Sequence, residues 1–296
     1  MNIEQIIEQM PGWKIGNIKY EPLSGGYSNK LFKVFTEDRI YALRINGEQN
    51  EHLNLKYTDE VEIIKLASEY GIAPGVPEYT NKLDYLITEF IDGQMISVKE
   101  MHNPELITEV ISLLKKVHHL PYSGTRYSTV FSLTRGYMTG AEKLGLEIPT
   151  ELNEQFTKMK FIEMEREKDP IYMKQYCHND VFNHNLIRNS EGNIKLIDWE
   201  LSGIGDIWFD LATLSFSCGF NEAEEEIMLL SYFGIYDDHK RKTLKDIKFA
   251  CMIREIGWAL LHTAINRNLP QPGNDYMDFA QNVLSRLNEG KFSLVD

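Results

Sequence analysis

Short runs of β-branched and aromatic residues dominate the first third of the chain. Two such runs cover residues 30–36 and 40–45, and the polar pair Glu37-Asp38 separates them. This composition is typical of strands, and a short polar break between two runs is typical of a hairpin. We therefore expect an antiparallel sheet here, with a further strand over residues 84–90 that the polar stretch "IDGQ" ends.

Apolar residues at helical spacing appear next and then dominate the rest of the chain. They occur over residues 57–70, where Gly71 and Pro74 act as stop signals, and again over residues 105–120. The same spacing covers most of the chain after Asn221, and one more strand-like run, "NIKLIDWE", lies at residues 193–200. The pattern predicts an α+β fold with two lobes. A small antiparallel β-rich lobe would span residues 1–92 and a larger, mostly helical lobe residues 93–296, with a hinge near residues 91–94.

Composition and charge narrow the classes of function. The chain has 296 residues, of which 43% are hydrophobic and 25% charged, which is ordinary for a globular protein. Its net charge of -13 argues against a nucleic-acid partner, because phosphate binding depends on clustered Lys and Arg. No apolar run approaches the ~20 residues needed to span a bilayer, and the three cysteines form no CxxC pair. We expect a cytoplasmic protein without a membrane partner, while a monomer and a homodimer both remain open.

The strongest chemical signal is "CHNDVFNHN" at residues 177–185. Asp180 and Asn185 have the H-x-D-x-x-x-x-N spacing of a kinase catalytic loop, in which the Asp accepts the hydroxyl proton and the Asn holds magnesium. Asp198 ends a predicted strand 18 residues after Asp180, where such enzymes carry a second metal-binding carboxylate. Carboxylate and amide oxygens are the ligands that Mg²⁺ prefers.

Each of these residues also has a structural explanation when it is taken alone. An Asp in a turn is commonly a local cap, and His178 alone would be a hydrogen-bonded core residue. A hydrolytic metal site built from His178, Asp180 and His184 is a second alternative, although the stretch lacks the H-E-x-x-H spacing of such sites. The ordered combination with Asp198 favours the kinase interpretation.

The first lobe contains the parts that a nucleotide site would need. Gly25 and Gly26 in "LSGGYSN" allow the backbone to approach phosphates. "YALRI" carries a basic residue for the phosphates, Arg44, whose ion-pair partner we expect to be Glu60, with Glu62 as the alternative. The predicted nucleotide-binding residues are Ser24, Gly25, Gly26, Ser28, Asn29, Arg44 and Glu60, together with the backbone of Glu89 and Ile91 for adenine.

Together, "LSGGYSN", "YALRI", "LITEFIDG", "CHNDVFNHN" and "LIDWELSGIGDIWFDLA" resemble the choline/ethanolamine kinase family, within the wider group of aminoglycoside phosphotransferase-like kinases. The resemblance runs from about Leu23 to Tyr276. It implies a protein-kinase-like fold and ATP- and Mg²⁺-dependent phosphorylation of a small-molecule hydroxyl. Asp180 would be the base, Asn185 and Asp198 would hold magnesium, and His178 and Asp210 would support the catalytic loop without touching the reactants.

The resemblance also implies a site for a cationic amino alcohol, since aromatic faces and carboxylates attract an ammonium group. The candidate residues are Asp180 for the hydroxyl, Trp258 and Tyr276 for the aromatic wall, and Glu200 and Asp206 for negative charge. Trp258 also has a purely structural explanation, because apolar residues surround it on its helix.

Three positions depart from the choline kinase pattern. Leu201 replaces a tyrosine, Ser217 falls where an acidic residue is common, and Leu261 falls where a second tryptophan is common. A thiamine kinase and an aminoglycoside phosphotransferase that confers antibiotic resistance therefore remain alternatives. A nucleotide-binding pseudokinase is an alternative of another class, and the retention of Asp180, Asn185 and Asp198 argues against it.

Overall fold

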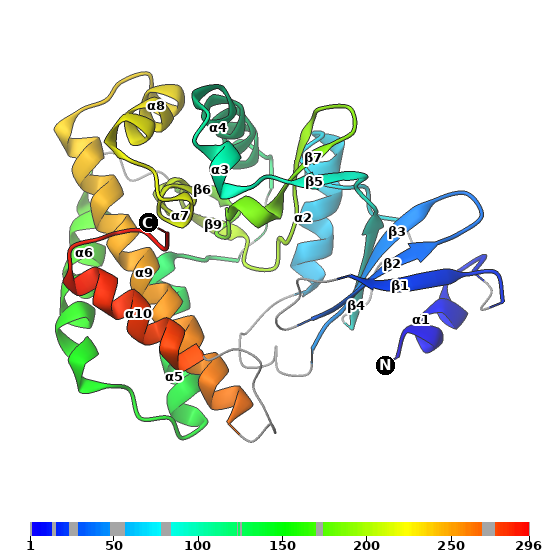
Figure 1. Ribbon diagram of the computed structural model, residues 1–296, viewed down its shortest axis with the longest axis horizontal. Helices are drawn as coiled ribbons and strands as arrows, with labels where there is room; N and C mark the ends of the chain where they lie inside the picture. Colours follow the sequence, from blue (N-terminus) through cyan, green and yellow to red (C-terminus); the bar gives the residue numbers. More distant parts are fainter. Residues whose placement is uncertain are drawn as a thin grey trace. The chain divides into compact units, whose positions relative to one another are not determined.

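The computed structural model describes residues 2–13, 16–23, 29–47, 57–77, 84–122, 124, 126–169, 174–267 and 276–295. The chain divides into two compact units (Figure 1). The N-terminal unit consists of residues 1–95 and 186–200, and the C-terminal unit of residues 96–185 and 201–296. The strand hairpin over residues 186–200 thus belongs with the β-rich unit, while the predicted lobe boundary at residues 92/93 stays a prediction.

A four-stranded antiparallel sheet forms the body of the N-terminal unit. Its strands run in the order β1 (Lys19–Leu23), β2 (Lys30–Phe35), β3 (Ile40–Ile45) and β4 (Tyr85–Glu89). The predicted hairpin is confirmed, since β2 and β3 are antiparallel and the turn between them is closed by hydrogen bonds from Thr36 to Arg39. β1 was not predicted as a separate strand. It lies at the edge of the sheet, where its Pro22 can be accommodated.

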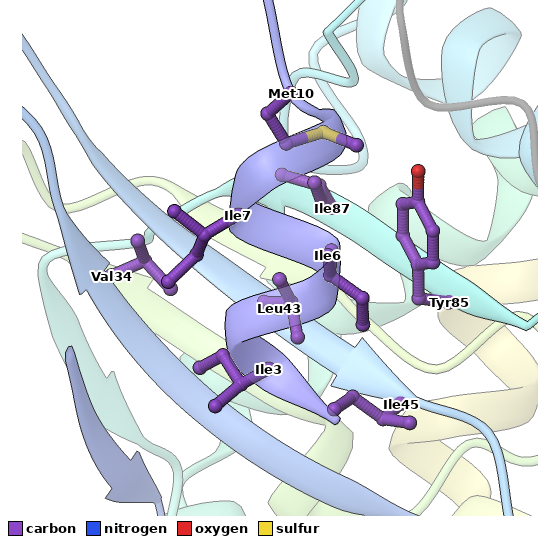
Figure 2. Close-up of a cluster of buried hydrophobic side chains, with 9 residues drawn as sticks. All are labelled: Ile3, Ile6, Ile7, Met10, Val34, Leu43, Ile45, Tyr85 and Ile87. Carbon is purple, nitrogen blue, oxygen red and sulfur yellow. The ribbon is translucent and has the colours of Figure 1, made fainter. Parts of the chain in front are cut away.

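A helix at the N-terminus, α1 (Ile3–Gln9), covers one face of this sheet and was not predicted. Asn2 and Gln5 form a capping box at its start, each side chain accepting from the other's backbone N–H. Figure 2 shows its apolar side chains packed on the sheet residues. The cluster contains Ile3, Ile6, Ile7, Met10, Val34, Leu43, Ile45, Tyr85 and Ile87. Ile3, Ile6, Ile7 and Met10 have helical spacing, so the sequence did contain a signal for this helix.

Successive side chains of β3 point to opposite faces of the sheet, so its apolar core residues lie on one face and its charged residue on the other. Leu43 and Ile45 pack in the cluster with α1, so Arg44 projects from the opposite face. Its partner there, Glu60, belongs to α2 (Tyr57–Glu69), the helix predicted from the apolar spacing. The unit is completed by a small sheet in the order β5 (Gly93–Met95), β7 (Leu186–Asn189) and β8 (Ile194–Leu196). Gly93 is required in β5, because a Cβ there would lie 2.3 Å from the carbonyl oxygen of Arg188.

The C-terminal unit is helical, as predicted, and is organised around the long helix α9 (Asp238–Asn266). In Figure 1, α9 lies beside α5 (Val130–Lys143) and α10 (Tyr276–Asn288), and it also packs on α7 (Trp208–Cys218) and α6 (Asn153–Lys168). The other helices are α3 (Val98–Met101), α4 (Pro104–His118), α8 (Glu222–Phe233) and the 3-10 turns Thr150–Leu152 and Asn183–Asn185.

A two-stranded ladder of β6 (Lys174–Cys177) and β9 (Gly203–Asp206) leads into the "CHNDVFNHN" loop. Neither strand was predicted. The α+β fold class is nevertheless confirmed, with an antiparallel sheet followed by helices. Among the described residues, none of the helices combines the length and the apolar character needed to cross a bilayer.

Candidate active site

Arg44 is the centre of the charged cluster in the N-terminal unit. Its Nη1 and Nη2 donate to the two carboxylate oxygens of Glu60 at 2.9 and 2.5 Å, and its Nε donates to Asn46 at 3.0 Å. The side chain of Glu60 is only 1% exposed. Burial by itself would lower the pKa of Arg44, but the charges of Glu60, Glu200 and Asp198 outweigh it and raise that pKa, so the guanidinium stays charged.

Asp198 and Glu200 both approach Arg44 from the end of the β8 hairpin. Arg44 Nη1 lies 3.4 Å from Asp198 Oδ1 and 3.6 Å from Glu200 Oε2. Asn29 joins the cluster, since its Nδ2 donates to Glu200 at 3.4 Å and its Oδ1 accepts the N–H of Gly47 at 3.1 Å. Asp198 has a left-handed backbone, with φ at 63°. Glu200 is predicted from the sequence as a substrate residue, and in the structure its carboxylate lies beside Arg44, a predicted nucleotide-binding residue.

Of the remaining residues predicted to bind nucleotide, the structure describes only Glu89 and Ile91. Ser24, Gly25, Gly26 and Ser28 lie outside the described residues. The backbone N–H of Glu89 donates to the carbonyl oxygen of Gly75 at 2.7 Å, and its carboxylate pairs with Arg39. A contact between adenine and Glu89 would therefore have to use the carbonyl oxygen of that residue. Ile91 follows the end of β4 and is half-buried.

Two Arg–Glu pairs of this unit differ in burial and provide a matched test. We expect Arg44→Lys to lower the free energy of unfolding by about 1–3 kcal/mol, because an ammonium cannot replace the two-pronged hydrogen bond to a buried carboxylate. Arg39→Lys is the control, since the side chains of Arg39 and Glu89 are 62% and 45% exposed, and such a pair contributes about 0–1 kcal/mol. Urea titration of both variants measures the difference. Equal losses of unfolding free energy would show that the buried pair of Arg44 and Glu60 stabilises this unit no more than the exposed pair does.

In the C-terminal unit, Asp210 fixes the backbone of the "CHNDVFNHN" loop. Its two carboxylate oxygens accept the N–H groups of His178 at 2.9 Å and Asn179 at 2.6 Å. The Nε2 of His118 lies 2.9 Å from the same carboxylate, and its Nδ1 lies 2.7 Å from the hydroxyl of Tyr232. Asn179 has φ at 66°, and its Nδ2 donates to the carbonyl of Leu201 at 2.9 Å. These contacts hold a strained turn directly before Asp180.

Asp180 itself is held from two sides and keeps 17% of its side chain exposed. Asn185 Nδ2 donates to Asp180 Oδ2 and to its carbonyl oxygen, both at 2.9 Å. Arg254 Nη1, from α9, lies 3.4 Å from Asp180 Oδ1. Because the amide nitrogen of Asn185 is used in this way, its Oδ1 points elsewhere and is the atom suited to a divalent cation. In the N-terminal unit, the carboxylate of Asp198 is 40% exposed and supplies the same kind of oxygen.

Arg254 and its neighbour Glu255 are not among the site residues predicted from the sequence. Both are buried, and the guanidinium lies 5.6 Å from the ring of Phe182 and 5.5 Å from that of Phe209. Arg254 Nη2 lies 2.7 Å from Glu255 Oε1, but the alignment is not that of a hydrogen bond. Burial raises the pKa of Glu255, and the positive charge of Arg254 opposes this rise. A charged pair on an otherwise apolar helix face was the only signal in the sequence.

The aromatic residues predicted for substrate do come together. The ring of Trp258 lies 5.5 Å from that of Tyr276, edge to face, and 4.5 Å from the imidazole of His262. Tyr276 stacks on His262 at 5.1 Å, and Phe279 lies 6.3 Å from Trp258. Trp258 and Tyr276 are half-buried, whereas His262 is 2% exposed. We call Trp258, His262, Tyr276 and Phe279 the aromatic cluster.

Asp206 does not fit the predicted role in substrate binding. It is 5% exposed, and both its oxygens accept from Arg166 of α6, at 2.6 and 3.2 Å. The N–H of Trp208 donates to it as well, at 3.3 Å. Its carboxylate therefore pairs with Arg166 in the interior, where it joins β9 to α6.

The hydrolytic metal site considered from the sequence also finds no support. Within the described ranges, the only group of three potential metal ligands is His118, Cys177 and Asp210, all buried. Both ring nitrogens of His118 and both oxygens of Asp210 already have hydrogen-bond partners. Burial also raises the pKa of the Cys177 thiol well above its usual range, so this trio is not suited to a cation either.

Comparison with known proteins agrees with the geometry. The family model described as choline/ethanolamine kinase matches residues 20–226, which is more than half of the chain. The chain belongs to the choline/ethanolamine kinase family. Human ethanolamine kinase 1 is 26% identical over 219 residues, which is 68% of this chain and 47% of the human protein. The match thus spans about half the length of that relative.

Solved structures show the fold. A choline/ethanolamine kinase family protein from Mesorhizobium loti has a TM-score of 0.77 at 21% identity, covering 96% of this chain and 92% of that one. A spectinomycin phosphotransferase, in complex with ADP and spectinomycin, has a TM-score of 0.62 at 13% identity, covering 99% and 96%. The predicted family and the kinase-like fold are both confirmed.

Proposed function

We propose that the protein is an ATP-dependent phosphotransferase that acts on the hydroxyl of a small alcohol. Family membership supports this proposal, and so does the ADP bound by the spectinomycin phosphotransferase of similar fold. The main observation behind the proposal is the setting of Asp180. Asn185 donates to one of its carboxylate oxygens and Arg254 to the other, and the carboxylate is still partly exposed. A fixed carboxylate that a ligand can reach is what a hydroxyl group needs in order to lose its proton during transfer.

In the proposed reaction, Asp180 orients the acceptor hydroxyl and accepts its proton as the oxygen attacks the terminal phosphorus of ATP. The bond from that phosphorus to the bridging oxygen breaks, and ADP leaves. Positioning and electrostatics supply most of the rate in such transfers. His178 and Asp210 act through the loop backbone, since the N–H of His178 donates to Asp210.

Residues of the N-terminal unit would serve the nucleotide. Arg44, oriented by Glu60, offers a charge that stays positive for phosphate oxygens, and Asn29 would contribute from the start of β2. Asn185 in the C-terminal unit and Asp198 in the N-terminal unit each carry a side-chain oxygen of the kind that Mg²⁺ prefers. A bound Mg²⁺ ion would neutralise charge on the phosphates.

The acceptor is proposed to be cationic. Trp258 and Tyr276 present aromatic faces, and the side chain of Tyr276 lies edge to face with that of Trp258. An ammonium group over such rings gains electrostatic attraction that a neutral alcohol does not.

The test is an ADP-release assay with a panel of alcohols. We expect turnover with a small amino alcohol such as choline or 2-aminoethanol, dependent on added Mg²⁺, and little with thiamine or an aminoglycoside. ADP release that no alcohol of the panel stimulates would contradict the proposal, and so would turnover that EDTA leaves unchanged.

A further inference from the structure

Two buried acceptor atoms on α9 have no hydrogen-bond partner in the described part of the chain. They are Oε1 of Glu255 and Nε2 of His262, in side chains whose residues are 6% and 2% exposed. Leaving a buried polar atom unpaired costs about 1–3 kcal/mol, and more when it is charged. Such atoms are uncommon in native proteins and call for an explanation. A ligand that donates hydrogen bonds would supply one.

Glu255, Trp258 and His262 are spaced by three and four residues, so they share one face of α9. The proposed aromatic wall thus continues directly into the carboxylate of Glu255, which has an ion-pair partner in Arg254 but no hydrogen bond at Oε1. His262 does not oppose a cation there, because burial lowers the pKa of its imidazole to about 4 and the ring is neutral at pH 7.

The charged groups next to this face carry one more negative charge than positive charge when both carboxylates are ionised. Arg254 Nη1 lies 3.4 Å from Asp180 Oδ1, and its Nη2 lies 2.7 Å from Glu255 Oε1. Two carboxylates therefore share one guanidinium. When both are ionised the group carries one net negative charge, which a single ammonium would balance.

We infer that Glu255 accepts a hydrogen bond from the amine of the acceptor, so the enzyme prefers an amino alcohol whose nitrogen carries N–H hydrogens to a quaternary ammonium alcohol. The inference rests on the proposed function for the identity of the acceptor site. A quaternary nitrogen has no hydrogen to donate, so it would cover Glu255 Oε1 without giving it a hydrogen bond. Sites with buried polar groups discriminate strongly against ligands that lack the matching hydrogen-bonding group.

The test measures binding separately from turnover. Isothermal titration calorimetry with 2-aminoethanol, its N-methyl and N,N-dimethyl derivatives and choline gives four dissociation constants. We expect 2-aminoethanol to bind about ten-fold or more tightly than choline, with the largest single loss at the last methylation, which removes the final N–H. In Glu255→Met, which keeps the side-chain volume, the four constants should fall within about two-fold of one another.

Controls separate this role from a structural one. Asp246→Asn changes a carboxylate of the same helix that pairs with Lys242 at 2.7 Å on the surface, and it should leave all four constants unchanged. Glu255→Met is expected to slow turnover by disturbing Arg254 and Asp180, so the ratio of dissociation constants is the readout rather than kcat. Glu255→Gln, which keeps an acceptor oxygen but loses the charge, should give an intermediate ratio.

The outcomes distinguish the two proposals. Preferential binding of choline, an unchanged ratio in Glu255→Met, or no binding of 2-aminoethanol would each overturn the inference, even if ADP release showed a kinase. The expected binding ratios together with no ADP release from any alcohol would overturn the proposed function and leave the amine site standing.

Discussion

Asp180→Asn is expected to lower the rate of alcohol-dependent ADP release by about 10²–10⁴-fold, the range over which a positioned general base contributes. The amide keeps the shape of the side chain but cannot take up the hydroxyl proton. Its one amide oxygen can keep the contact with Asn185 or the contact with Arg254, which are 2.9 and 3.4 Å in Asp180, while its NH₂ group faces the other donor. The main loss should appear in kcat, and the loss of stability should be smaller than in Asp210→Asn because Asp180 is partly exposed.

Two measurements accompany this variant. Calorimetric titration with a non-hydrolysable ATP analogue should give an unchanged dissociation constant, since Arg44, Glu60 and Asp198 are untouched. Asp246→Asn, an identical chemical change on the surface of α9, should retain full activity. Turnover of Asp180→Asn at the rate of the unaltered protein would remove the proposed base from the mechanism.

Asp210→Asn is expected to have the largest effect on stability, about 3–5 kcal/mol of unfolding free energy, because it removes the charge from a fully buried hydrogen-bonded group. Its carboxylate is 0% exposed and serves two backbone N–H groups and the imidazole of His118. An amide replaces one acceptor oxygen with an NH₂ group. At least one of these three donors would then face another donor inside the protein.

Activity should fall with stability in this variant, even at temperatures where it remains folded, because the N–H groups that Asp210 holds come just before Asp180 in the chain. Chemical denaturation and ADP release at 15 °C measure the two effects. Tyr232→Phe is the matched control, since it removes only the hydroxyl at the far end of the same chain of contacts, 2.7 Å from His118. That loss should be about 0.5–1.5 kcal/mol. Similar losses for both variants would show that Asp210 does not anchor the loop.

Features set by neighbouring residues could be predicted from the sequence. The β2–β3 hairpin and the helices α2 and α4 follow from local composition and spacing, and the structure has them close to the predicted positions. The spacing of Asp180 and Asn185 likewise anticipates two side chains that meet across five residues. The α1 helix was missed although Ile3, Ile6, Ile7 and Met10 carry its period.

Pairings between distant segments were decided by tertiary structure alone. Glu200 and Asp206 are close in sequence and look equivalent, yet one approaches Arg44 and the other pairs with Arg166. Arg254 reaches Asp180 across 74 residues of sequence. The sequence around a charged residue does not identify its ion-pair partner, because the partner is whichever opposite charge the packing brings within a few ångströms. The sequence by itself therefore determined the β2–β3 hairpin, the helices α2 and α4, the family and the motif of the loop, whereas packing decided which carboxylate pairs with which buried arginine.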